Sequence, residues 1–413
     1  MQDTELYSQI LGVTAPWSVV AVKLDLDQQA VRVSIDFDGK QAAFCCPTCG
    51  QYANLYDRRE ERTWRHLDSC QFKTYLVASL PRVECKHHGI QTAEVFWCEP
   101  HSRFTALFER FALDVLQATQ VQAKAARLLR LSSDQMEYLM HKAVQRGLAR
   151  RDPAAVIAHA GLDEKAFHQG HQYATILSDL DQKRVLDLVE KRTQEAATTL
   201  LDTALSPVQK AGVQSVSMDL WLAFANARAQ VLPQAEVVHD RFHVAGYLNE
   251  AVDLTRKEEH RRLSRADDPT LAKTKYLWLR SEGTLSDKQQ TALATLSGLD
   301  LETAQVWAFK ECFRQFFACT TEYGAQTFFL QWYEAAQAVG NKHLSKVASL
   351  LHKHLDGLLA YIRHRVTNAI AENLNGQIQR IKTNARGFRH FANFRIAVLF
   401  YLGKLDLYPQ TLR

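Results

Sequence analysis

One stretch near the middle of the chain, residues 215–244, constrains the fold more than any other, because it predicts a strand, a helix and a second strand in close succession. The first apolar run ends at Asp219, an amphipathic helix follows until Pro233 interrupts it, and the second apolar run ends beside Asp240. A crossover helix makes two such strands parallel neighbours, and open α/β sheets carry their chemistry at the carboxyl ends of the strands. The stretch therefore predicts two carboxylates at one edge of a sheet.

Three further strands and a helix are expected before this stretch. The strands fall at residues 156–162, 173–178 and 184–189, and the helix at 193–205. The complete order is three antiparallel strands feeding a parallel pair, which is the topology of the RNase-H-like fold. In that fold the first and fourth strands are central neighbours, so we expect Asp163, which follows the first, to lie beside Asp219. Two such carboxylates can share one or two divalent metal ions.

A third carboxylate is expected from the C-terminal helical region. An apolar stripe there packs on the sheet, and its members are Val366, Ile370, Leu374, Ile378 and Ile381. Glu372 lies off this stripe, on a polar and basic face. A lone acid on such a face is usually solvated or paired with an arginine. Because this helix returns to the sheet after a long insertion, we favour Glu372 as a third metal ligand.

Paired cysteine and histidine residues near the N-terminus predict a structural zinc site. A β-hairpin at residues 17–38 leads into a C-x-x-C knuckle, and a C-x-x-H spacing follows a second β-rich run. The expected ligands are Cys46, Cys49, Cys85 and His88. Cys45 and His87 are neighbouring alternatives, and a hairpin with unligated cysteines is the competing interpretation. Cys70 and Cys98 have no paired neighbour, so we expect them to be packed thiols.

Length and composition indicate a chain of several globular domains. The 413 residues exceed one ordinary core, and 46% hydrophobic with 23% charged residues is typical of a folded protein that is not membrane-embedded. No apolar run approaches the roughly 20 residues of a membrane span, and the N-terminal residues lack the pattern of a secretion signal. We therefore expect a cytoplasmic protein whose cysteines bind metal and do not form disulfides.

Two basic blocks predict contact with a polyanion. Residues 121–151 contain seven Lys or Arg against two Asp or Glu, and residues 361–413 contain nine against two. The first block reads as two helices around a short turn, with Ser132 or Ser133 capping the second, which is a helix-turn-helix pattern. An ordinary helical hairpin is the alternative. The basic residues expected to touch DNA are Lys124, Arg127, Arg130, Arg365, Arg380, Lys382, Arg386 and Arg389.

These patterns predict a multidomain α+β chain. From residue 245 to 358 the strand signals vanish, so we expect an all-helical insertion whose aromatic residues mostly form its own core. The expected parts are a β-rich zinc-binding module at 1–102, a helix-turn-helix region at 103–152, an RNase-H-like core at 153–244, the insertion at 245–358 and the closing core helices at 359–413.

Long strings in the right order carry a resemblance to a known family. They include CPTCG with CKHHG, GLDEKAF at residue 161, SMDLW at 217, HDRFHV at 239 and YIRHRVTNAIAENLNGQIQRIKTNARGF at 361. The chain resembles the ISL-three family of bacterial insertion-sequence transposases, within the DDE class. The resemblance implies a catalytic triad of Asp163, Asp219 and Glu372. It also implies an auxiliary D-x-x-H pair, Asp240 and His243, whose role is either catalytic or structural.

The resemblance further implies a function and its requirements. We expect a transposase that binds terminal inverted repeats in double-stranded DNA and catalyses strand cleavage and strand transfer with Mg²⁺ or Mn²⁺, while Zn²⁺ is structural. A dimer or larger assembly on DNA and a cytoplasmic, nucleoid-associated location in a bacterium follow, with no membrane partner. The alternatives are a transposase-derived DNA-binding regulator and an RNase-H-like nuclease without strand transfer.

Overall fold

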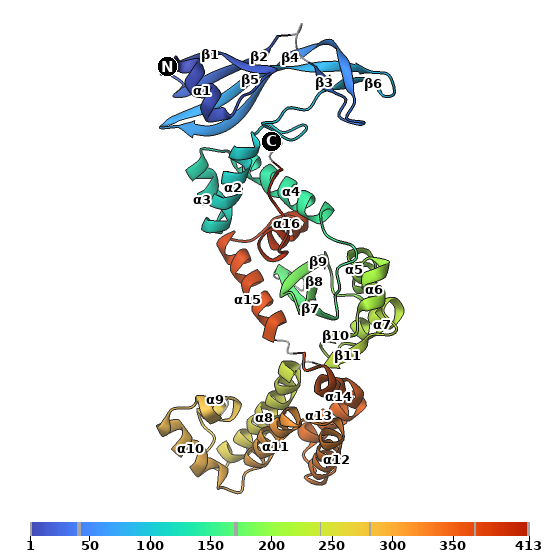
Figure 1. Ribbon diagram of the computed structural model, residues 1–413. Helices are drawn as coiled ribbons and strands as arrows, with labels where there is room; N and C mark the ends of the chain where they lie inside the picture. The colour runs from blue at the N-terminus through green and yellow to red at the C-terminus, as the bar shows by residue number, and fades with distance from the viewer. Residues whose placement is uncertain are drawn as a thin grey trace. The chain divides into compact units, whose positions relative to one another are not determined.

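A computed structural model describes residues 2–38, 43–168, 172–239, 241–280, 282–366 and 369–410 (Figure 1). The chain forms two compact units, and each is described by itself below. The first consists of Met1–Arg151 with Leu405–Arg413, and the second of Asp152–Lys404. The expected site residue Asp240 lies outside the described residues. No helix within the described ranges combines the length and apolar character needed to cross a membrane.

A six-stranded sheet dominates the first unit. After helix α1 (Asp3–Leu11), its strands are β1 (Trp17–Asp25), β2 (Ala30–Phe37), β3 (Phe44–Cys45), β4 (Tyr52–Ser69), β5 (Phe72–Cys85) and β6 (Gly89–Thr92). β1 and β2 form the predicted antiparallel hairpin, β2 pairs with β5 in parallel, and β4 and β5 form a long antiparallel pair. Trp17, Trp64 and Trp97 pack edge to face in the core of the sheet, with ring centroids 4.9 and 5.7 Å apart.

Three helices complete the first unit. They are α2 (Ala106–Thr119), α3 (Gln122–Leu129) and α4 (Ser133–Ala149). The predicted cap at the start of α4 is Ser132, whose hydroxyl accepts from Gln135 N at 3.2 Å while the Gln135 side chain accepts from Ser132 N. The sharp turn between α3 and α4 is made by Arg130, which has the left-handed φ of 56°.

A buried ion network joins α2 and α4 and contacts Leu407 near the C-terminus. Glu109 is 1% exposed and forms ion pairs with Lys142 and Arg146, both of which also contact Glu99. Arg146 in addition donates to the carbonyl of Leu407. Since each buried charge has several partners, the network satisfies groups that would be costly to bury alone.

A five-stranded mixed sheet is the centre of the second unit. Its strands are β7 (His159–His168), β8 (Gln172–Asp179), β9 (Arg184–Glu190), β10 (Ser215–Met218) and β11 (Glu236–His239), in the spatial order β11-β10-β7-β8-β9. β7, β8 and β9 are antiparallel, whereas β10 is parallel to both β7 and β11. The crossover helices are α5 (Gln194–Ala204), α6 (Pro207–Gly212) and α7 (Leu222–Val231). The predicted order of strands and helices is thus observed with one addition, the short helix α6 before β10, and β7 and β10 are neighbours inside the sheet.

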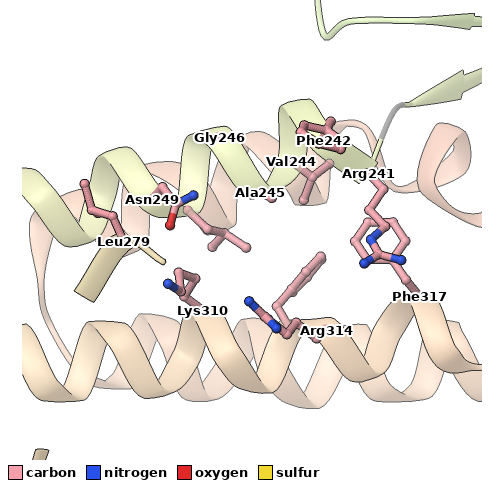
Figure 2. A pocket seen from close by; sticks show the side chains of 12 residues that line it. Arg241, Phe242, Val244, Ala245, Gly246, Asn249, Leu279, Lys310, Arg314 and Phe317 are labelled. Carbon is pink, nitrogen blue, oxygen red and sulfur yellow. The ribbon is translucent and has the colours of Figure 1, made fainter. Parts of the chain in front are cut away.

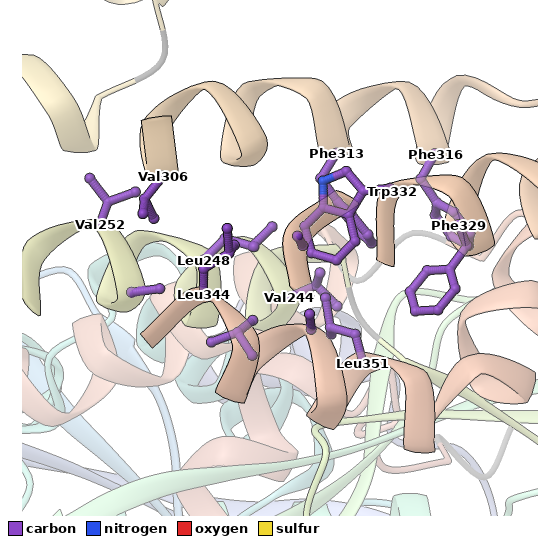
Figure 3. Packing of buried hydrophobic residues seen from close by; sticks show 14 of the residues in the cluster. Val244, Leu248, Val252, Val306, Phe313, Phe316, Phe329, Trp332, Leu344 and Leu351 are labelled. Carbon is purple, nitrogen blue, oxygen red and sulfur yellow. The ribbon is translucent and has the colours of Figure 1, made fainter. Parts of the chain in front are cut away.

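A helical segment follows β11, as predicted. Its members are α8 (Arg241–Ser264), α9 (Lys275–Leu279), a short 3-10 turn (Glu282–Thr284), α10 (Asp287–Ser297), α11 (Glu302–Ala318), α12 (Glu322–Ala338), α13 (Lys342–Lys353) and α14 (Leu355–His364). Figure 3 shows apolar side chains of α8, α11, α12 and α13 meeting in one core, among them Phe313, Phe329 and Trp332. Most of its aromatic residues are therefore core, while Tyr276 is 63% exposed.

Two final helices return to the sheet. α15 (Ala369–Asn384) packs against β7, and α16 (Phe391–Leu402) packs against β9. Leu374 and Ile378 of the predicted stripe are buried, together with Ala371. The long helical segment is therefore inserted between β11 and a helix that contacts the central strand of the sheet.

Candidate functional site

Two aspartates lie at the same level of two neighbouring strands. Leu162 of β7 is the register partner of Met218 of β10, and the pair is parallel. Asp219 directly follows the end of β10, whereas Asp163 lies inside β7 and not after its end as we expected, because β7 continues to His168 in its pairing with β8. Each aspartate is the next residue after the paired Leu162 and Met218, so the two occupy adjacent positions on neighbouring strands. Neighbouring strands are about 4.8 Å apart, which places the two carboxylates within reach of a common ligand. Both residues are partly exposed.

Asp219 is held by the first turns of α8. Its Oδ1 lies 3.4 Å from the hydroxyl of Tyr247 and 3.5 Å from Nδ1 of His243, and it accepts from Leu220 N at 2.6 Å. His243 and Tyr247 are four residues apart, so they present their side chains on one face of the helix. Burial, followed by the charge of Asp219, raises the pKa of Tyr247 to about 12. The phenol therefore stays protonated and can donate to the carboxylate.

Asp163 is held by α15. Asn375 Nδ2 donates to Asp163 Oδ2 at 2.6 Å, and Glu164 N donates to Oδ1 at 2.7 Å. Glu372 is three residues before Asn375 in the first turn of α15, and residues at this spacing share a helix face. The hydrogen bond from Asn375 therefore brings the first turns of α15, which contain Glu372, to the part of β7 that contains Asp163. Glu372 is half-buried there.

The three acids have the ligand type that a hard divalent cation requires, since carboxylate oxygens bind Mg²⁺ and Mn²⁺. Their oxygens do not, however, form a closed set. Among the described residues, one group of metal-binding side chains has its ligand atoms all within 4.8 Å of one another, and it lies in the first unit. The assignment of Asp163, Asp219 and Glu372 as catalytic residues stays a prediction, and so does the auxiliary role of Asp240 with His243.

The group in the first unit is the predicted zinc-ligand set, Cys46, Cys49, Cys85 and His88. The Sγ atoms of Cys49 and Cys85 are 3.7 Å apart, and His88 Nδ1 lies 3.7 Å from Cys46 Sγ and 3.6 Å from Cys85 Sγ. Two sulfurs about 2.3 Å from one tetrahedral ion are about 3.8 Å apart. The donor atoms and their spacing therefore fit a closed, structural zinc site.

Two glycine turns shape this zinc site. Gly50 and Gly89 follow the two knuckles with φ of 69° and 65°, a conformation that favours glycine.

The backbone N–H of His87 and then the side chain of His88 lower the pKa of Cys85 to about 6. The site thus favours the thiolate, which is the form that binds metal.

The remaining cysteines are separate from this set. Cys45 and His87, the alternatives in register, are not members of the group that the described residues form. Cys98 is buried, so it is the packed thiol that we predict, and its burial raises the pKa of the thiol to about 12. The same prediction for Cys70 is wrong, because Cys70 is exposed in the tight turn between β4 and β5, with a φ of 56°.

Comparison with known families decides the identity. The family model described as Transposase, which represents DDE transposases of the ISL-three group, matches residues 160–398, more than half of the chain. This chain belongs to the ISL-three family of DDE transposases. A second model, the zinc-finger of the transposases IS204, IS1001, IS1096 and IS1165, matches residues 42–88 and contains all four predicted zinc ligands. The family resemblance noted from the sequence is confirmed.

Two curated relatives of this family member cover most of its length. The transposase for insertion sequence element IS1001 of Bordetella parapertussis is 28% identical over 83% of this chain and 85% of its own length. The transposase for insertion sequence element IS1557 of Mycobacterium tuberculosis is 24% identical over 94% of this chain and 93% of its own. The similarity therefore extends over both compact units.

The basic residues that we expected to touch DNA fall into two groups. Seven of the eight are exposed, and Lys382 is partly exposed. Three of them have contacts within the protein: Arg130 pairs with Asp68, Arg365 donates to the Cys319 carbonyl, and Lys382 donates to the Ala166 carbonyl. The other five are Lys124, Arg127, Arg380, Arg386 and Arg389. Because Arg130, Arg365 and Lys382 help to join elements of this transposase family member, the other five are the better candidates for contact with DNA.

The sequence reasoning missed two residues that hold the acids. Asn375 is one helical turn from Glu372, and Tyr247 is one turn from His243. Helical spacing from a predicted site residue is the signal that could have found both. Helical spacing alone does not identify such residues, because polar residues at this spacing are common on exposed helix faces.

Proposed function

We propose that this chain is a DDE transposase that binds the terminal inverted repeats of its insertion sequence and catalyses metal-dependent cleavage and strand transfer. The observation that carries the proposal is the meeting of three elements, β7, β10 and α15, around Asp163. β7 and β10 bring Asp163 beside Asp219, and the Asn375 hydrogen bond brings the helix of Glu372 to them. The strand order supports an RNase-H-like catalytic core.

Asp163, Asp219 and Glu372 would hold Mg²⁺ or Mn²⁺. A divalent pair at such a site supplies activation of water or a 3′-hydroxyl and stabilisation of the leaving 3′-oxygen. The protein's own part is to orient the carboxylates. Asn375 donates to Oδ2 of Asp163 and Glu164 N donates to its Oδ1, while Tyr247 and His243 contact Oδ1 of Asp219, so each carboxylate is held in one orientation.

The first unit has the features of a DNA-binding region. Its helices α3 and α4, of which α4 is capped by Ser132, fit the helix-turn-helix pattern that we expect, and Lys124 and Arg127 are exposed on α3. We propose that these helices and the zinc module recognise the inverted repeats, in a dimer or larger assembly on DNA of the nucleoid. Contacts with the phosphate backbone of DNA weaken as the salt concentration rises.

The proposed function is tested with end-bearing DNA, Mg²⁺ and the Asp219→Asn variant. This substitution removes a hard anionic ligand at almost constant size, so we expect cleavage to fall by at least about a thousandfold while end binding persists. Asp202→Asn, at an exposed acid paired with Lys210, is the matched control and keeps activity. Continued cleavage by Asp219→Asn contradicts the metal assignment.

The same reaction separates the alternatives. Joined products support a transposase, cleavage without joining supports a nuclease, and a mobility shift without cleavage supports a DNA-binding regulator. Because the assay reports binding, cleavage and joining separately, each outcome points to one of the three.

A further inference from the structure

A pocket lies between α8 and α11, on the helical segment that follows β11. Its volume is about 330 Å³, and Leu279 of α9 closes one end. Figure 2 shows Lys310 and Arg314 extending from α11 toward α8, and Asn249 extending from α8 toward α11. Polar groups from two facing helices therefore converge on one space whose size is typical of a small-molecule site.

The polar groups of this pocket are mostly cationic. Its lining residues, among those that the structure describes, include Arg241, Lys310 and Arg314 and no carboxylate. Glu311 pairs with Lys310 at 3.2 Å and with Arg314 at 2.9 Å, so it neutralises part of this charge. Three cations with one acid behind them leave a positive pocket, which suits a ligand that carries an anionic group.

The rest of the wall is flat and apolar. Phe313 and Phe317 of α11 face Val244 and Leu248 of α8 across the pocket. The guanidinium of Arg241 lies 6.0 Å from the centroid of the Phe317 ring. Aromatic and aliphatic walls with an arginine beside them are the surroundings in which a planar nucleobase can stack.

One polar atom in the pocket lacks a partner. Asn249 Oδ1 is buried, and no donor from the described residues reaches it. A buried polar atom without a hydrogen bond costs free energy, so a ligand that donates to this amide would be favoured. The exocyclic amine of a nucleobase is such a donor.

The pocket is close to the proposed catalytic acids. Arg241, Val244 and Leu248 belong to the same first turns of α8 as His243 and Tyr247, which contact Asp219 from another face of the helix. A helix with its side chains is about 10–12 Å across, so the two faces are separated by roughly the length of one or two nucleotides.

We propose that this pocket binds one nucleotide of the DNA that has left the base stack beside the cleavage site. The base lies between the walls of Phe313, Phe317 and Leu248, with Asn249 on its edge. Arg241 and Arg314 contact its phosphate. This inference rests on the proposed function, because it places a residue of the bound DNA next to the acids that would cut it.

The test uses the full chain and duplexes that carry the ends of its element, with 2-aminopurine at successive positions around the cleavage site. The fluorescence of this base rises when it leaves the stack, so binding is read with Ca²⁺ in place of Mg²⁺ and without cleavage. Gly246→Leu is the blocking variant, because Gly246 lines the pocket and a Cβ there meets nothing within 4 Å. Gly246→Ala is its matched control.

We expect one position to show a several-fold rise with the unsubstituted chain and with Gly246→Ala, and no rise with Gly246→Leu. Arg241→Gln is a second variant at an exposed side chain, with Arg261→Gln on the same helix as its control. We expect Arg241→Gln to weaken end binding by about tenfold, because it removes one phosphate contact, and Arg261→Gln to leave end binding unchanged. Thermal melting of every variant checks that it is folded.

Each of three outcomes would overturn either the assignment of the pocket or the proposed function. A rise that persists in Gly246→Leu, or no rise at any position, overturns the pocket while cleavage by the unsubstituted chain still supports the proposed function. Tight binding of free dAMP that Gly246→Leu abolishes, without a signal from DNA, assigns the pocket to a free nucleotide. A normal signal with no cleavage in Mg²⁺ overturns the proposed function and leaves the pocket standing.

Discussion

Asn375 Nδ2 lies 2.6 Å from Asp163 Oδ2, although the two residues are 212 positions apart in the chain. The intervening residues build four strands of the sheet and the whole helical segment before α15 returns. This one hydrogen bond therefore connects β7, the first strand of the second unit, to α15 near the end of that unit. It also fixes which face of α15 meets the sheet, and with it the direction of the Glu372 side chain relative to the sheet.

Replacing Asn375 with Leu should slow cleavage. The substitution removes the donor that orients Asp163, and groups that support metal ligands typically contribute 10–100-fold to metal affinity or activity. We expect a loss of about that size in cleavage rate, together with a higher Mg²⁺ requirement and unchanged end binding. Asn373→Ala, at an exposed position of the same helix, is the control. Equal rates at every Mg²⁺ concentration would show that Asn375 does not position Asp163.

Removing zinc should unfold the knuckles of the first unit. Cys49→Ser takes away one of four ligands whose spacing fits a tetrahedral ion, and structural zinc contributes directly to folding. We expect about one zinc per unsubstituted chain, loss of that zinc in the variant, and loss of end binding in both the variant and the chelated protein. Cys45→Ser, at an exposed neighbouring thiol, should retain the metal. Metal analysis with a mobility-shift assay measures both, and zinc retained by Cys49→Ser would count against the site.

Acid should destabilise the first unit through His66. Burial, followed by the charge of Arg65, lowers the pKa of His66 to about 4 from its usual 6.5. The folded state therefore prefers neutral His66, so this contribution is present above pH 6.5 and is lost as pH falls toward 4. At pH 5 the loss is about 2 kcal/mol in the free energy of unfolding.

The measurement is guanidinium denaturation at pH 7.5 and pH 5 for the unsubstituted chain and for His66→Asn. Asparagine retains a group that can bond Thr105 Oγ1, which His66 Nδ1 approaches at 2.9 Å. The variant should lose less stability between the two pH values, whereas acid release of zinc affects both proteins alike. Parallel pH slopes for the two proteins would disprove this role.

A methyl group at Gly357 should destabilise the second unit. Gly357 of α14 packs directly on His239 at the end of β11, and an added Cβ would lie 2.3 Å from His239 Cδ2. His239 is buried, so neither ring nor helix can move away without cost, and overpacking of this kind costs about 1–3 kcal/mol. Gly376→Ala, where a Cβ meets nothing within 4 Å, should be neutral or slightly stabilising. Melting temperatures compare the two, and equal values would mean that this contact is not tight.

Local patterns in the sequence determined much of this protein. In the strand-helix-strand stretch at residues 215–244, the two apolar runs end at Asp219 and Asp240. The apolar patterns and turn residues that predict these strands lie within a few neighbouring residues. The knuckle spacing likewise identified Cys46 and Cys49, because two residues between ligands suffice for a tight turn. Cys70 was misjudged, since the position of a residue in a turn or in a core depends on the strand pairing around it.

Only the tertiary structure decided which polar groups hold the acids and where the pocket lies. Asn375 reaches Asp163, and Tyr247 reaches Asp219, through the packing of α15 and α8 on the sheet. The pocket depends on Lys310 and Asn249 facing each other from helices that are about sixty positions apart. Periodicity predicts the faces of a helix, but it contains no information on which other helix each face will meet, because that choice is made by side-chain packing over the whole unit.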